Sequence, residues 1–207
     1  MSWLCASHLN WALVALGVIM GLMIHSMGEV PANVERAFYI YLLDYGWQEP
    51  IRDALFDNFQ LLADHASKND AVVFQGTVGH HFTDEVLSWH SVNGLDGEDI
   101  LPAILITTRN PHEFSERRVD PTQHNMLLIP LRNICKTPTD VIGIIKKIVS
   151  DISAKKELPD FKVAQEIRAG DSGSLVDALI LQPNISGVGV DLNKIISLFR
   201  RKKETRY

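Results

Sequence analysis

Four short runs of the sequence are mostly apolar from end to end, and this pattern constrains the fold more than any other feature. They are residues 38–43 (FYIYLL), 70–75 (DAVVFQ), 101–107 (LPAILIT) and 126–131 (MLLIPL). Such runs, rich in aromatic and aliphatic residues, predict strands. Because apolar residues do not alternate with polar ones along them, we expect a sheet that is covered on both faces.

Segments with helical spacing separate these runs. The spacing predicts amphipathic helices over residues 50–67 and 139–153 and a shorter helix over residues 83–89. Pro50 suits the first position of its helix, because its fixed φ is helical and its missing N–H is not needed there. The order strand–helix–strand–helix–strand–strand–helix predicts a single three-layer α/β domain with a mixed sheet, spanning residues 29–156.

An apolar leader, residues 1–28, precedes this domain and contains no Asp, Glu, Lys or Arg. Its unbroken apolar centre, residues 11–24, would rise about 21 Å as a helix, which is less than the ~30 Å hydrocarbon core. Only the longer segment 9–27 reaches spanning length. The leader is a membrane or signal segment, an apolar N-terminal helix buried in the domain or an oligomer, or a stretch before a true start at Met27.

Cysteine content and net charge exclude several classes of function. The only cysteines, Cys5 and Cys135, lie far apart, so neither a disulfide framework nor a structural zinc site is expected. This favours a reducing compartment and a cytoplasmic location, with membrane anchoring through residues 9–27 as the alternative. The net charge of −5 gives no attraction to nucleic acid. No cofactor and no metal are expected.

Residues 38–156 resemble the thioredoxin-like fold. A tryptophan-containing turn (YGWQEP, residues 45–50) joins the first strand to a helix, Pro102 opens the third strand, and a strand and an apolar helix close the unit. The resemblance implies a cis Leu101–Pro102 bond that faces the turn, with Tyr45, Trp47 and Pro102 as a candidate ligand cleft. The family's catalytic CxxC motif, which lies at the start of the first helix, is absent here, so the resemblance implies no redox activity. Another three-layer α/β arrangement is the alternative.

The densest group of candidate metal ligands lies in residues 80–90 (HHFTDEVLSWH). His81 and Glu85 are four residues apart, as are His80 and Asp84, so either pair could share a helix face. The spacing matches no metalloprotease motif, and a polar helix start after a glycine turn explains it equally. A small hydrolase or metal-dependent enzyme that uses the His80/His81 region is therefore the alternative function.

The C-terminal part is expected to be an extension of the domain. Residues 157–174 are interpreted as a charged tether, and residues 175–207 as a strand followed by a helix that ends in RRKK. The helix carries an apolar stripe formed by Leu192, Ile195, Ile196 and Phe199. Exposed apolar stripes mark interfaces, whereas the cations equally suit a helix C-terminus. We expect a non-catalytic protein-binding or adaptor protein that uses this stripe to bind a protein partner, with a membrane-surface contact as the alternative.

Overall fold

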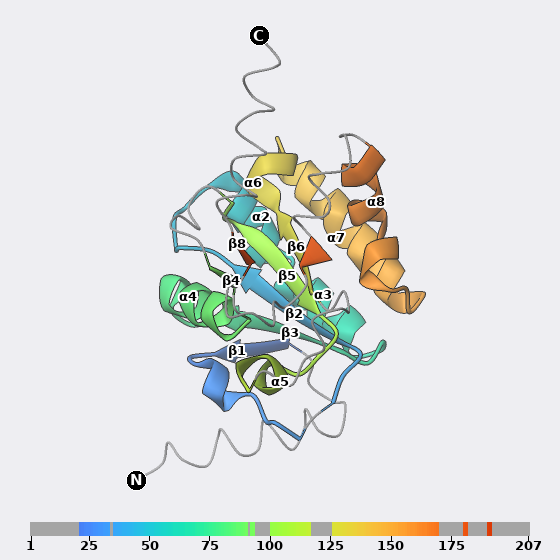
Figure 1. Ribbon diagram of the computed structural model, residues 1–207. Helices are drawn as coiled ribbons and strands as arrows, with labels where there is room; N and C mark the ends of the chain where they lie inside the picture. Colours follow the sequence, from blue (N-terminus) through green and yellow to red (C-terminus); the bar gives the residue numbers. More distant parts are fainter. Residues whose placement is uncertain are drawn as a thin grey trace.

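The computed structural model describes residues 21–33, 35–90, 92–93, 100–116, 126–169, 180–181 and 190–191. These residues form one α/β domain built on a mixed sheet (Figure 1). Its strands are β1 (Gly21–Ile24), β2 (Phe38–Leu43), β3 (Ala71–Gly76), β5 (Ala103–Thr107), β6 (Met126–Pro130) and β7 (Ile180–Leu181), in the spatial order β1-β3-β2-β5-β6-β7. β1 and β2 run parallel to β3, whereas β5, β6 and β7 each pair antiparallel with the preceding strand of that order. A two-stranded sheet joins β4 (Val92–Asn93) to β8 (Val190–Asp191).

Helices cover both sides of the main sheet. They are α2 (Pro50–Asp57), α3 (Phe59–Ala66), α4 (Gly79–Trp89), α5 (Pro111–Ser115), α6 (Leu131–Ile134), α7 (Pro138–Ser153) and α8 (Lys162–Ala169), with 3₁₀ turns η1 (Met27–Glu29) and η3 (Leu158–Asp160). α2 and α3 pack against α7 on one side, and α4 and α5 lie together on the other (Figure 1). The predicted helix 50–67 is thus two helices divided at Asn58, and the helix predicted from Thr83 begins four residues earlier.

The predicted coverage of both sheet faces is confirmed. Every residue of β2, β5 and β6 is buried, so side chains that point to either face are shielded from water. This explains why these strands carry no alternating polar residues. The Leu101–Pro102 peptide bond is cis, as the resemblance implies.

The N-terminal boundary differs from the prediction. Gly21–Ile24, assigned to the leader, is the edge strand β1, and Met27 is completely buried. The domain therefore includes residues from Gly21 rather than starting at residue 29. Within the segment 9–27, Gly21–Ile24 is a strand and not part of a spanning helix, because its backbone pairs with β3 while Leu22 and Ile24 enter the core. Within the described ranges, no helix is long and apolar enough to cross a membrane.

Residues 158–169 also differ from the prediction, because they pack on the domain instead of forming a tether. Leu158, Phe161, Val163 and Ala164 are buried, and the Phe161 ring lies 5.8 Å from that of Phe38. The buried Asp151 carboxylate accepts a hydrogen bond from the Lys162 amide at 2.6 Å, which fixes the start of α8. Part of the predicted strand 175–181 is confirmed as β7. The stripe Leu192, Ile195, Ile196 and Phe199 lies outside the described residues.

Candidate functional site

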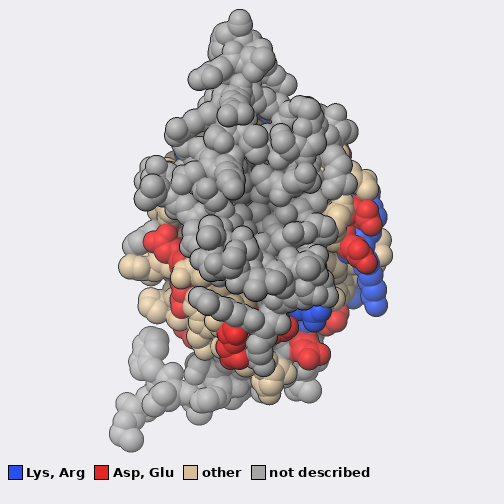
Figure 2. All heavy atoms as spheres, in the orientation of Figure 1, with Lys and Arg blue, Asp and Glu red and all other residues tan. Residues whose placement is uncertain are grey.

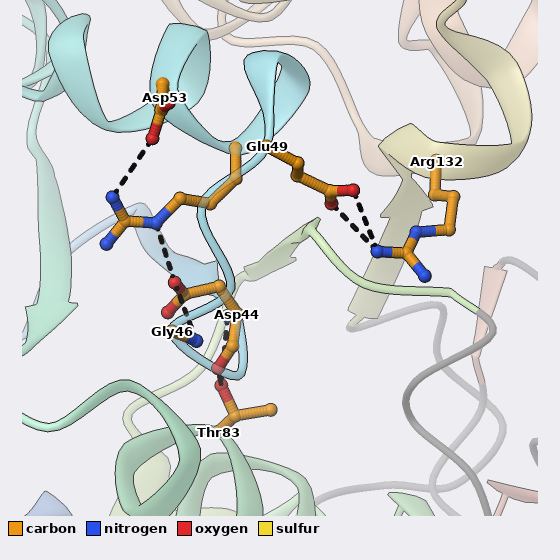
Figure 3. A network of polar contacts seen from close by, with 7 residues as sticks. Asp44, Gly46, Glu49, Asp53, Thr83 and Arg132 are labelled. Carbon is orange, nitrogen blue, oxygen red and sulfur yellow. Dashed lines mark hydrogen bonds and ion pairs between the residues drawn. The ribbon is translucent and has the colours of Figure 1, made fainter.

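The candidate site is the β2–α2 turn, residues 44–49, at the carboxyl end of β2 (Figure 3). β2 and β3 are parallel, so they end at the same edge of the sheet, and the helices that follow them, α2 and α4, both begin there. Ligands of α/β proteins commonly bind at such an edge, where loops and helix starts converge.

A buried carboxylate organises the turn. Asp44 Oδ2 accepts hydrogen bonds from the Gly46 amide at 3.1 Å and from Arg52 Nε at 2.9 Å. The hydrogen bond to Asp44 raises the pKa of Arg52 above its usual value. Gly46 has a φ of +82°, a conformation that strongly favours glycine. The Thr83 hydroxyl donates to the Asp44 carbonyl at 2.7 Å and accepts from the Asp44 amide at 3.1 Å, so the turn is bound to α4 as well as to α2.

A second ion pair fixes the other end of the turn. Arg132 Nη2, on α6, lies 2.9 Å from both carboxylate oxygens of Glu49 (Figure 3). The same guanidinium lies 5.4 Å from the centre of the Trp47 ring, within the range of a cation–π contact. Arg132 thus connects the turn to the segment that follows β6.

The turn exposes an aromatic pair. The Tyr45 and Trp47 rings are 6.1 Å apart and meet edge to face, and Trp47 is 45% exposed. The Tyr45 hydroxyl donates to Asp84 Oδ1 at 3.4 Å. Trp47 therefore presents a large apolar surface to solvent from a position that several contacts fix.

The third predicted cleft residue, Pro102, is buried. Its carbonyl accepts a hydrogen bond from the Leu131 amide at 3.0 Å, which ties the start of β5 to α6. The helix α6 consequently contacts Pro102 through Leu131 and Trp47 through Arg132. Sequence reasoning missed Arg52 and Arg132; Arg52 follows Pro50 on the predicted helix, but nothing local indicates that Arg132 pairs with Glu49.

The candidate ligands of residues 80–90 point to different partners. Asp84 accepts from Tyr45, whereas Glu85 accepts from the Ser26 hydroxyl and the Met27 amide, both at 2.9 Å. His90 is buried in the core, and His81 is exposed. The side chain of His80 lies outside the described part. Within that part, no group of three or more His, Cys, Asp or Glu side chains could hold a metal ion.

Cys135 follows α6 and is buried. Burial raises the pKa of its thiol to about 11, with a smaller contribution from the nearby Asp140 carboxylate. The thiol is therefore protonated and unreactive at neutral pH. Cys5 lies outside the described residues.

Comparison with known proteins gave no match: no family model, no curated protein and no solved structure is similar to the chain. The functional argument therefore depends on the geometry of the β2–α2 turn.

Proposed function

We propose that this protein is a non-catalytic protein-binding or adaptor protein, built on a thioredoxin-like domain without redox cysteines, and that the β2–α2 turn is a docking surface. The observation that carries the proposal is Trp47, which is 45% exposed although Arg132 and Tyr45 both contact its ring. Tryptophan supplies more binding energy at interfaces than most residues, above all when it anchors a contact in a fixed position.

The rigidity of the turn favours binding. A partner that covers an aromatic side chain gains apolar burial but loses part of that gain if the side chain must first be immobilised. Here the Asp44–Arg52 and Glu49–Arg132 ion pairs hold both ends of the turn before any partner arrives. The surface is pre-organised, so little ordering entropy opposes binding.

Two features support a thioredoxin-like arrangement without thiol chemistry. The strands β1, β3 and β2 are parallel and are followed in the sheet by antiparallel β5 and β6, with α2 and α7 on one side and α4 on the other. The start of α2, where that family carries its cysteines, consists here of Gln48, Glu49, Pro50 and Ile51. Glu49, in this segment, pairs with Arg132 and helps to fix the turn.

The test uses a purified partner. The full chain would be used to capture binding proteins, and dissociation constants would then be measured with one identified partner. We expect Trp47→Ala to raise the Kd at least tenfold, which corresponds to about 1.4 kcal/mol or more. Leu61→Ala, which truncates a side chain on α3 that is 39% exposed, is the matched control and should leave the Kd unchanged.

Both variants should keep the thermal stability of the parent chain. An unchanged Kd for Trp47→Ala would refute the assignment of the docking surface. If a Leu192→Ala/Phe199→Ala variant lost binding instead, the docking surface would be the C-terminal stripe.

A further inference from the structure

Around Trp47, the described carboxylates outnumber the guanidiniums that pair with them. Six described charged side chains are linked to the turn by hydrogen bonds or ion pairs, four carboxylates and two guanidiniums: Asp44, Glu49, Asp53, Asp84, Arg52 and Arg132. Arg52 binds Asp44 at 2.9 Å and reaches Asp53 at 3.3 Å, and Arg132 binds Glu49. Asp53 and Asp84 are exposed, and among these six described side chains the carboxylates outnumber the guanidiniums by two.

The charged side chains of the described surface are unevenly distributed (Figure 2). Figure 2 shows Asp and Glu side chains on the side of the molecule where α4 lies, and Asp and Glu mixed with Lys and Arg on the opposite side, where α7 and α8 lie. A partner that approaches the turn from the α4 side meets the exposed carboxylate of Asp84, next to Tyr45. Like charges at an interface cost free energy on association, whereas opposite charges speed encounter and improve selectivity.

The aromatic pair gives a second, independent preference for a cation. Trp47 already accepts one guanidinium, that of Arg132, at 5.4 Å from its ring. The indole is the aromatic ring that attracts cations most strongly, and 45% of Trp47 is still exposed. Tyr45 contacts both Trp47 and Asp84, so one carboxylate lies next to the aromatic pair.

We infer that the partner presents a basic segment to this surface, with an arginine or lysine that stacks on Trp47 and pairs with Asp84. This inference rests on the proposed docking function and adds the chemistry of the partner. An acidic segment would meet the exposed carboxylates with like charge. A purely apolar segment would remove them from water without giving them a counter-ion.

The test follows the indole N–H resonance of Trp47 in full-length protein labelled with nitrogen-15, assigned with a Trp47→Phe variant. The remaining tryptophans are internal controls. Three blocked peptides of equal length are titrated: Gly-Arg-Gly-Arg-Gly and its glutamate and leucine counterparts. We expect a saturable shift of the Trp47 resonance with the arginine peptide, and a several-fold higher apparent Kd when salt is raised from low to physiological ionic strength.

Asp84→Asn keeps the acceptor for the Tyr45 hydroxyl and removes only the charge, so it should raise the apparent Kd of the arginine peptide several-fold. Asp64→Asn, on the exposed face of α3, is the matched control and should change nothing. The inference is overturned if no peptide shifts the resonance, if the leucine or glutamate peptide binds at least as well, or if Asp84→Asn has no effect. If an identified partner's binding depended on Trp47 but not on Asp84 or salt, the inference of a basic segment would be refuted. The proposed docking function would still stand.

Discussion

At the residue scale, His90 shows how burial in the core changes the pKa of a side chain. The side chain is completely buried between the rings of Tyr41 and Phe114, and Nδ1 forms a 2.7 Å hydrogen bond with the Val86 carbonyl. Burial disfavours the charged imidazolium and lowers the pKa of His90 from 6.5 to about 4. The histidine is therefore a neutral packing residue rather than a metal ligand or a catalytic base.

Stability should consequently depend on pH through His90. Between about pH 6.5 and pH 4 the unfolded chain binds a proton at this residue and the folded chain does not, so stability is complete above pH 6.5 and falls as the pH decreases. The shift predicts a loss of about 2 kcal/mol between pH 7.5 and pH 5. Urea unfolding of a His90→Gln variant should lack this part of the pH dependence, whereas a His65→Gln variant, changed at a half-buried histidine, should retain it. Parallel pH profiles for the parent chain and His90→Gln would contradict the assignment.

At the scale of elements, close packing between strands and helices depends on small residues. A Cβ added to Gly76, at the end of β3, would lie 2.5 Å from Phe82 Cγ on α4 and closer still to Phe82 Cβ. These atoms sit at the base of the side chain and cannot move without shifting the helix. A Cβ added to Gly143, on α7, would meet nothing within 4 Å.

Gly76→Ala and Gly143→Ala should therefore have opposite effects on stability. The first must separate β3 from α4, and we expect it to lower the free energy of unfolding by about 1–3 kcal/mol. The second fills open space in a helix and should raise it by up to about 1 kcal/mol. Denaturant midpoints measure both. Equal effects of the two substitutions would show that β3 and α4 are not in close contact.

Strand β1 provides a second prediction for an element. A chain that begins at Met27 lacks Leu22 and Ile24, whose burial is worth roughly 1.5–3 kcal/mol each, and it exposes the edge of β3. We expect this chain to unfold at a lower urea concentration and to aggregate more than a chain that begins at Gly21. The comparison leaves residues 1–20 out of both chains, so it measures the contribution of residues 21–26, which comprise β1, His25 and Ser26. Identical midpoints would show that the strand contributes nothing to the fold.

At the scale of the whole molecule, one apolar core extends from β1 to α8. Phe161, which precedes α8, is completely buried and lies against Phe38 of β2, more than a hundred residues earlier in the chain. The segment after α7 therefore unfolds with the sheet.

Phe161→Ala should lower the free energy of unfolding by about 3–5 kcal/mol, because it leaves a cavity beside β2. Gln165→Ala, on the exposed face of α8, should change it by less than about 0.5 kcal/mol. Chemical denaturation checks both variants. A neutral effect of Phe161→Ala would restore the interpretation of this segment as a tether.

The sequence predicts the aromatic residues of the candidate site, Tyr45 and Trp47. It does not predict the ion pair between Glu49 and Arg132. The sequence places Tyr45 and Trp47 in a turn because a strand pattern ends before them and Pro50 marks the helix that follows. Arg132 lies 83 residues from Glu49 in the chain, and no local pattern links the two. A pairing of this kind depends on how β6 and α6 return to the same edge of the sheet.

The sequence by itself determined the four central strands and their coverage on both faces, because the composition of a strand is a local property. The runs 38–43 and 126–131 predict buried strands, and β2 and β6 lie there with every residue buried. Only the tertiary structure decided which short apolar stretches join the sheet. Gly21–Ile24 reads equally as the end of an apolar helix, and it is a strand because the edge of β3 offers hydrogen-bond partners and the core covers Leu22 and Ile24.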